Sequence, residues 1–361
     1  MQSRTNLFTC PGGDTIQLLK TKEYLENSGI EVDISIELEP DLSKYDIIHL
    51  FNLTRVQETF IQVKNAKKQN KPVILSTIYW PSNEFEKKGQ YGIRKYISNI
   101  LSINNIESIK AFYKYVFKNE RDIGTKYLIT HKFTDMQKYI LENSKYFLPN
   151  SKSEMDMIEK YIGYSTKNYN VVPNAVDINR IDDGQGEFAK YKDYIICVGR
   201  IETRKNQLNL LKSIKNTPYK LLIVGKIAPN HMKYGKKVMD EISKNPNVEY
   251  IESLTNQDIY KLYSVCKVHV LPSWYETPGL VSLEAAVMGC NIVVSDRGTT
   301  RDYFKKFAYY CEPDNIESIK KSIDKAYTSS YNSDLRDMII KEYTWENTAK
   351  ETIKGYKNIL K

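Results

Sequence analysis

Short apolar runs alternate with amphipathic segments along the second half of the chain. Five runs rich in β-branched residues predict strands at 194–198, 220–224, 248–251, 268–271 and 291–294. Between them, apolar residues at three- and four-residue spacing predict helices over 206–214, 236–242, 256–266 and 280–288. Strands that alternate with helices build parallel βαβ units, so this half predicts a doubly wound α/β domain.

The first half of the chain repeats this alternation more loosely. Strands are predicted at 7–9, 31–36, 47–51 and 72–78, and helices at 15–28 and 56–69. Residues 177–190 are polar, contain two glycines and lack periodicity, which indicates a linker. We therefore expect an N-terminal Rossmann-like domain over 1–180 and a second one over 181–342.

Composition excludes several classes of protein. The 361 residues are 41% hydrophobic and 12% aromatic, which excludes intrinsic disorder. No apolar run approaches the roughly 18 residues of a membrane span, and residues 1–7 lack the apolar core of a secretory signal, so a cytoplasmic protein is expected. The five cysteines are odd in number and never form a CxxC pair, which argues against a disulfide framework and a zinc site.

The net charge of +9 is unevenly distributed. Residues 51–150 contain 17 Lys and Arg against 8 Asp and Glu. Within this region, 82–126 interleaves lysines with aromatic residues, as does a helix that binds an anionic membrane surface. A helical excursion with its aromatic residues in the core is the alternative. Nucleic-acid binding is not expected, because no recognisable module accompanies the charge.

The strongest chemical motif follows the strand predicted at 268–271. A loop containing Glu276 leads into a helix that begins near Gly279, so the backbone N–H groups of 279–281 form an anion site. Glu284 lies eight residues after Glu276, which places two hydroxyl-accepting carboxylates beside the same helix start. A ligand with both hydroxyl and phosphate groups, such as a sugar nucleotide, matches this set.

Two further strand-to-helix turns carry candidate binding residues. Gly199 is followed by Arg200 and Lys205 at the carboxyl edge of the sheet, where two cations would neutralise a diphosphate. An ordinary basic helix start is the alternative. Gly12 and Gly13 would allow a close approach of the backbone to a ligand, although glycines at such turns often serve local geometry alone.

Together these motifs resemble the family 4 retaining glycosyltransferases of the GT-B fold, over most of the chain. The resemblance is carried by the E-x7-E pair of Glu276 and Glu284, by VGRIETRKNQ at 198–207, VVPNAVD at 171–177 and SDRG at 295–298. It implies two Rossmann-like domains that face a central cleft. It also implies that a C-terminal helix over 343–361 packs back on the first domain.

The resemblance assigns roles to these residues. It makes Glu276, Arg200 and Lys205 the catalytic group, with both cations on the departing diphosphate and Glu276 on hydroxyls of the donor sugar. Glu284 would bind the ribose. The remaining donor-binding residues would be Gly199, Gly279, Leu280, Val281, Gly12 and Gly13.

The resemblance also implies a reaction that needs no metal and no cofactor besides the nucleotide sugar. The sugar would pass with retention to a glycan or lipid-linked glycan, in bacterial surface polysaccharide or glycoconjugate synthesis, at the inner face of the cell membrane. The sequence departs from the family at the end of the strand predicted at 72–78, where a histidine is common in relatives; Tyr79 and His131 are candidate replacements. A sugar-nucleotide 2-epimerase and an inactive sugar-nucleotide-binding partner subunit are the alternatives.

Overall fold

The computed structural model describes residues 1–91, 93–117, 120–177, 186–277 and 279–360. The chain forms two compact units. The N-terminal unit comprises Met1–Asn83, Tyr96–Asn174 and Trp345–Lys361, and the C-terminal unit comprises Glu84–Lys95 and Ala175–Thr344. Most of the linker expected at 177–190, including the boundary expected between 180 and 181, lies outside the described residues.

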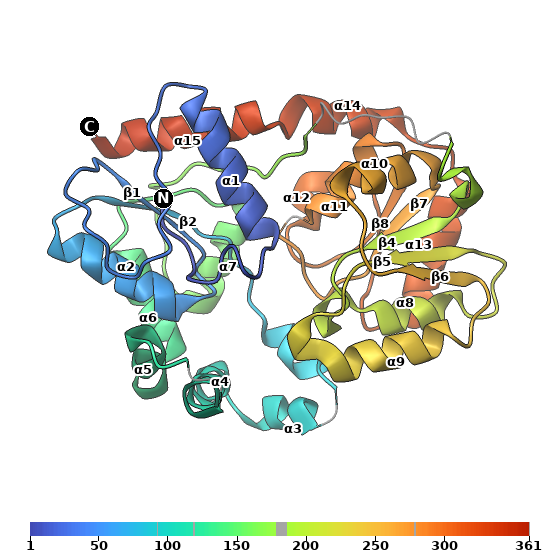
Figure 1. The fold of residues 1–361 in the computed structure, drawn as a ribbon, viewed down its shortest axis with the longest axis horizontal. Coiled ribbons are helices and arrows are strands. Elements are labelled where there is room, and N and C mark those ends of the chain that lie inside the picture. Colours follow the sequence, from blue (N-terminus) through green and yellow to red (C-terminus); the bar gives the residue numbers. More distant parts are fainter. Residues whose placement is uncertain (92, 118–119, 178–185, 278, 361) are drawn as a thin grey trace. The chain divides into compact units, whose positions relative to one another are not determined.

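The C-terminal unit is built on a parallel six-stranded sheet with the order β6-β5-β4-β7-β8-β9 (Figure 1). Five of the strands occur where the sequence predicts them, and the predicted α/β class is confirmed. The four strands at the centre of the sheet are buried along their whole length, which explains their continuous apolar runs. The strands are β4 (Ile195–Val198), β5 (Leu221–Val224), β6 (Val248–Ile251), β7 (Val268–Leu271), β8 (Asn291–Ser295) and β9 (Tyr309–Cys311).

Helices connect these strands. One group packs α8 against α9 and α13, and the other packs α11 against α10 and α14. In Figure 1, α10 and α11 lie on one side of the sheet and α8 and α9 on the other. Their bounds are α8 (Gln207–Ile214), α9 (Met232–Ile242), α10 (Asn256–Val265), α11 (Leu280–Val287), α12 (Thr300–Phe304), α13 (Ile316–Thr328) and α14 (Ser333–Glu342).

The N-terminal unit contains a smaller parallel sheet of β1 (Ile48–Phe51), β2 (Val73–Ser76) and β3 (Tyr146–Phe147), in that order. The predicted strand at 7–9 is wrong, since these residues form turns. The strand predicted at 31–36 is reduced to one bridge between Gln2 and Ser35. Neither segment has a continuous apolar run, so nothing in it required a full ladder of partners. The helices of this unit include α1 (Gly13–Glu26), α2 (Val56–Lys68), α7 (Lys152–Ile162) and α15 (Trp345–Leu360), of which α2 and α15 contact the sheet.

The last helix, α15, belongs to the N-terminal unit and packs against α1 and the sheet. Thr348 on α15 donates a hydrogen bond of 2.7 Å to the carbonyl oxygen of Pro173. Tyr356 lies 2.8 Å from Nδ1 of His49, a buried residue of β1 whose Nε2 lies 2.9 Å from Ser76. These contacts join the end of the chain to the strands of its first half.

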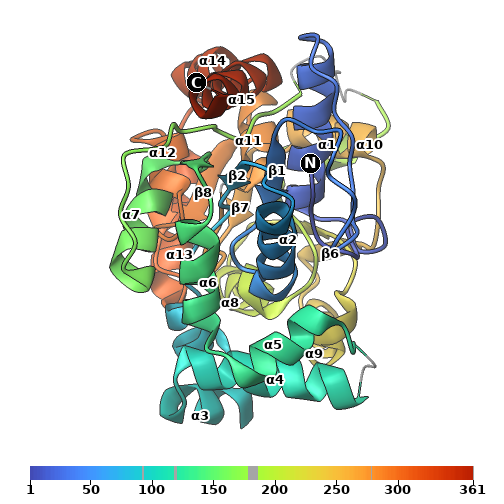
Figure 2. The same ribbon diagram turned by 90° about the vertical axis from the view of Figure 1, so that its left-hand side faces the viewer.

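The lysine- and aromatic-rich region predicted as one excursion is divided between the units. Residues 84–95, which include the π-helix Phe85–Gly89 (η1), belong to the C-terminal unit. From residue 96 the chain is again in the N-terminal unit, where α4 packs against α5 (Figure 2). Helix α3 (Ile93–Ile100) crosses this division, and α4 (Ile103–Phe117), α5 (Ile123–Thr130) and α6 (Phe133–Glu142) follow it in the N-terminal unit. Among the described residues, no helix is long and apolar enough to cross a membrane.

Candidate functional site

The candidate site in the C-terminal unit begins at the carboxyl ends of β4 and β5. Gly225, the residue after β5, lies so close to the chain after β4 that an added Cβ would be 2.1 Å from the carbonyl oxygen of Gly199. A side chain at position 225 would therefore push the two strand ends apart. A few residues after β4 the chain forms a 3-10 helix, Thr203–Lys205 (η4).

This 3-10 helix brings two cations onto one buried carboxylate. The Nζ of Lys205 donates to Oε1 of Glu276 at 2.6 Å, and Nη1 of Arg204 donates to the same oxygen at 3.1 Å. Arg204 also donates to the carbonyl oxygen of Tyr275 at 2.9 Å and to Glu202 at 3.0 Å. Lys205 and Glu276 are 9% and 6% exposed. The cluster therefore places concentrated charge in a largely dry setting at the sheet edge.

Electrostatics keeps the Glu276 carboxylate ionised. Burial by itself would raise the pKa of Glu276, but Arg204 and Lys205 outweigh it and lower the pKa to about 2. Burial lowers the pKa of Lys205, and the charge of Glu276 opposes that change. A carboxylate that remains charged at neutral pH accepts hydrogen bonds without donating, which suits contact with hydroxyl groups.

The loop that carries Glu276 leads into α11. Gly279 occupies the N-cap in the left-handed region, with φ +85°, and no side chain caps the helix there. Of the first backbone N–H groups of α11, that of Ser282 donates to the carbonyl oxygen of Gly279 at 2.9 Å, whereas among the described residues no group accepts from those of Leu280 and Val281. Glu284 lies on the same helix and is half-buried.

A second glycine, Gly298, packs closely against the backbone of Glu276. Gly298 pairs with Glu276 in a parallel bridge, and the N–H of Thr299 donates to the carbonyl oxygen of Glu276 at 2.9 Å. Gly298 has φ +78°, and an added Cβ would lie 2.1 Å from that same carbonyl oxygen. Position 298 of the SDRG motif therefore requires glycine, because the backbone of Glu276 occupies the space that a side chain would need.

The structure brings some of the predicted site residues together and leaves others apart. Lys205 and Glu276 are in direct contact, and the loop of Glu276 runs into Gly279. Arg200 does not join them: its side chain is 46% exposed, and its guanidinium lies 3.6 Å from Glu202. Arg204 was missed by the sequence reasoning, although it stands inside the motif at 198–207.

The predicted residues of the N-terminal unit lie on different elements of that unit. Gly12 is the N-cap of α1 and Gly13 its first residue, but the predicted strand before them is absent. Tyr79 packs in the core, and burial raises the pKa of its phenol. His131 ends α5 at the surface, with Nδ1 3.1 Å from the carbonyl oxygen of Tyr127.

The part of the chain that carries this cluster matches a known family model. Residues 179–344 match the family model described as glycosyl transferases group 1. These residues contain all of the C-terminal cluster described above. This part of the chain is a group 1 glycosyltransferase domain.

Individual proteins resemble this glycosyltransferase over different lengths. An uncharacterized glycosyltransferase of Methanocaldococcus jannaschii is 24% identical over 384 aligned residues, which cover 96% of this chain and 94% of that protein. The serotype-specific mannosyltransferase WbdA of Escherichia coli is 23% identical over 50% of this chain, but over only 24% of its own length. The chain therefore spans about a quarter of that relative.

A solved structure shares the fold. HepE of Anabaena, in complex with UDP and glucose, has a TM-score of 0.70 at 14% identity, and the alignment covers 99% of this chain and 100% of HepE. The chain of this glycosyltransferase thus has the GT-B fold, as the resemblance of its motifs implies.

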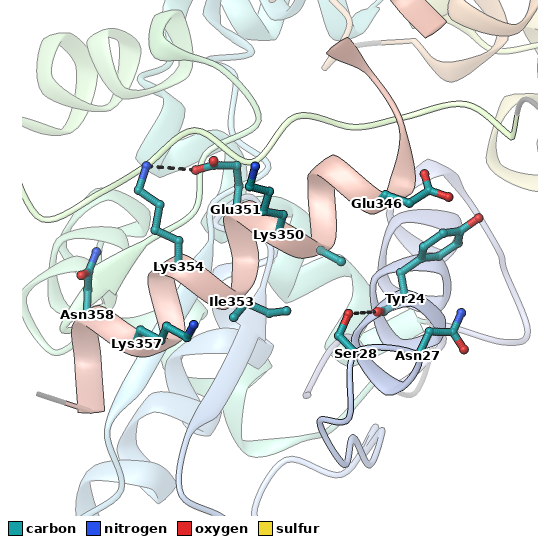
Figure 3. Close-up of a pocket in the computed structure, with 11 residues that line it drawn as sticks. Tyr24, Asn27, Ser28, Glu346, Lys350, Glu351, Ile353, Lys354, Lys357 and Asn358 are labelled. Atoms are coloured by element: carbon teal, nitrogen blue, oxygen red, sulfur yellow. Dashed lines mark hydrogen bonds and ion pairs between the residues drawn. The ribbon is translucent and has the colours of Figure 1, made fainter. Parts of the chain in front are cut away.

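A surface pocket of about 830 Å³ lies elsewhere in the glycosyltransferase, between α1 and α15 of the N-terminal unit (Figure 3). Lys350, Lys354 and Lys357 line it, and Lys354 lies 3.3 Å from Glu351. None of the predicted site residues lines this pocket. Among the residues that the structure describes, no group of three or more His, Cys, Asp or Glu side chains is arranged to hold a metal ion.

The low pKa of Glu276 predicts acid sensitivity of the glycosyltransferase. The pKa falls from an ordinary 4.5 to about 2 on folding, so its ion pairs stabilise the fold above pH 4.5 and lose that effect as the pH drops towards 2. Urea unfolding at pH 7, 5 and 3 should show wild type losing stability more steeply than Glu276→Gln, by about 3 kcal/mol at most. The control, Glu252→Gln at an exposed site, should follow wild type; equal slopes for all three would contradict the assignment.

Proposed function

We propose that this glycosyltransferase transfers a sugar from a nucleotide sugar, with retention of the anomeric configuration and without a metal ion. The observation that carries the proposal is the contact of Lys205 and Arg204 with Glu276 beside the uncapped start of α11. The cations and helix amides suit a diphosphate, and the carboxylate suits sugar hydroxyls. HepE, which shares the fold, was solved with UDP and glucose.

Each residue has a part in the proposed reaction. Without a donor, Glu276 and Glu202 together balance the charges of Lys205 and Arg204; when a nucleotide sugar binds, the phosphates take over part of that role. Arg200, whose side chain is half-exposed at the same sheet edge, would reach the diphosphate from solvent. As the bond to the sugar breaks, these cations stabilise the negative charge that grows on the leaving phosphate. The departing phosphate accepts the proton of the acceptor hydroxyl.

A panel of UDP-, GDP- and ADP-sugars tests donor binding by thermal shift. A ligand at a hundred times its Kd stabilises the folded state by about 2.7 kcal/mol, so one nucleotide class should raise the Tm clearly. Arg200→Ala should abolish the shift, whereas Lys212→Ala, at an exposed position of α8, should preserve it. Formation of an epimer from the donor alone would favour the 2-epimerase. Donor binding with no transfer and no hydrolysis would favour an inactive partner subunit.

We propose further that the acceptor is a lipid-linked glycan at the inner face of the cell membrane. Ile109, Phe112, Tyr113 and Val116 follow helical spacing along α4 and are 44 to 55% exposed, so they form an apolar stripe that faces solvent. Lys110 and Lys114 flank the stripe and are 45% and 42% exposed. Apolar side chains bordered by lysines suit an anionic bilayer surface.

Flotation with vesicles tests this part of the proposal. The protein should float with vesicles containing an anionic lipid at low salt and remain unbound with neutral ones. Phe112→Ser should reduce the bound fraction severalfold, because it removes an aromatic side chain from the stripe. Tyr161→Ser, at an exposed position of α7, is the matched control. Equal flotation of both variants with wild type would contradict the α4 surface.

A further inference from the structure

Residues 84–91 lie far from the donor-site motifs in sequence, yet they belong to the same unit. The π-helix Phe85–Gly89 contacts the 3-10 helix that carries Arg204 and Lys205. Its side chains reach the aromatic residues immediately before Glu276. The ring of Phe85 lies 6.5 Å from that of Trp274 and 6.2 Å from that of Tyr275. This segment therefore touches both halves of the Lys205–Glu276 cluster.

Gly89 sets how closely the segment approaches. An added Cβ at this position would lie 2.7 Å from the Nε1 of Trp274 and 2.5 Å from Phe85. Trp274 is 4% exposed, and its backbone N–H donates to the carbonyl oxygen of Arg204 at 2.8 Å. A side chain at position 89 would push on an indole whose own backbone is joined to the cation helix.

A second attachment lies on the opposite side of Glu276. Glu84 accepts from Nε of Arg297 at 2.7 Å and from its Nη2 at 3.2 Å, and the same Nη2 donates to Glu312 at 2.7 Å. Arg297 immediately precedes Gly298, whose backbone pairs with Glu276. Residues 84–91 therefore contact two stretches of the chain that border Glu276. Phe85 and Gly89 pack against Trp274, and Glu84 forms an ion pair with two nitrogens of Arg297.

We propose that Glu84, Phe85 and Gly89 are positioning residues for Glu276, so that the donor site includes a segment from the first half of the chain. The inference rests on the proposed function for its kinetic consequence. The Glu84–Arg297 pair is about one-third and one-quarter exposed, and partly exposed pairs add little to global stability. Its loss should therefore loosen the Glu276 loop without unfolding the protein.

Hydrogen exchange measured by mass spectrometry tests the positioning directly and needs no donor. In Gly89→Ala and Glu84→Gln, peptides covering 272–277 and 296–301 should exchange about tenfold faster than in wild type, because the N–H groups of Trp274 and Thr299 lose their protection. Peptides from β5 and α13 should be unchanged. Lys87→Gln is the matched control, since it removes an exposed charge from the same segment. Unchanged exchange in both variants, or faster exchange throughout the C-terminal unit, overturns the inference.

Kinetics supplies the second readout. In Gly89→Ala, kcat for donor turnover should fall about tenfold, since a small displacement of a catalytic group costs rate, while the donor KM should change less. Wild-type kinetics in a variant with a loosened loop would also overturn the inference. If wild type itself turns over no donor, the proposed function fails, and the exchange pattern still decides whether the segment positions Glu276.

Discussion

Lys205→Met is expected to lower kcat for sugar transfer by about 100-fold, or roughly 3 kcal/mol. Methionine keeps most of the length of the side chain but removes the charge that contacts Glu276 at 2.6 Å. In the proposed reaction this charge acts on the leaving diphosphate, where negative charge is greatest in the transition state. The loss should therefore appear mainly in kcat and less in KM. Initial rates over a range of donor concentrations measure both.

The control for this variant is Lys212→Met, at an exposed position of α8, which should keep wild-type kinetics. The Tm of both variants should be measured as well. Lys205→Met removes one of the two cations that contact Glu276 and leaves only Arg204, so the variant must be shown to remain folded. A Lys205→Met enzyme that is folded and within threefold of wild-type kcat would contradict the role of Lys205.

Gly298→Ala is expected to destabilise the C-terminal unit by more than about 2 kcal/mol and to abolish donor binding. The methyl group would meet the carbonyl oxygen of Glu276 at 2.1 Å and its nitrogen at 2.5 Å, and both are backbone atoms that cannot rotate away. The residue would also have to keep φ +78°. Urea unfolding and the donor thermal shift measure the two effects.

Gly289→Ala separates the clash from the backbone strain. Gly289 has φ +106°, but an added Cβ would meet nothing within 4 Å. This variant should lose only about 1 to 2 kcal/mol and should still bind the donor. Equal losses of stability in Gly289→Ala and Gly298→Ala, with donor binding kept in both, would contradict the prediction that the close approach of Gly298 to Glu276 matters for stability and donor binding.

The sequence by itself determined the central strands of the C-terminal unit and the helices between them. The four central strands are buried along their whole length, and such strands need nearly continuous apolar residues. These apolar runs are visible in the sequence. The motif around Glu276 and Gly279 was also readable, because a strand, a turn and a helix start follow one another directly along the chain. In the first half, the segments at 7–9 and 31–36 form few ladder bonds, and their weak apolar pattern was misleading.

Only the tertiary structure decided which cation meets Glu276 and what surrounds it. Arg200, Arg204 and Lys205 are equally basic in sequence, but the 3-10 turn directs the latter two inward and leaves Arg200 half-exposed. The placement of residues 84–91 against Trp274 and Arg297 likewise depends on contacts about 190 to 210 positions apart in the chain. Local patterns report which face of an element is buried, whereas such pairings depend on packing between distant elements, and no local periodicity encodes them.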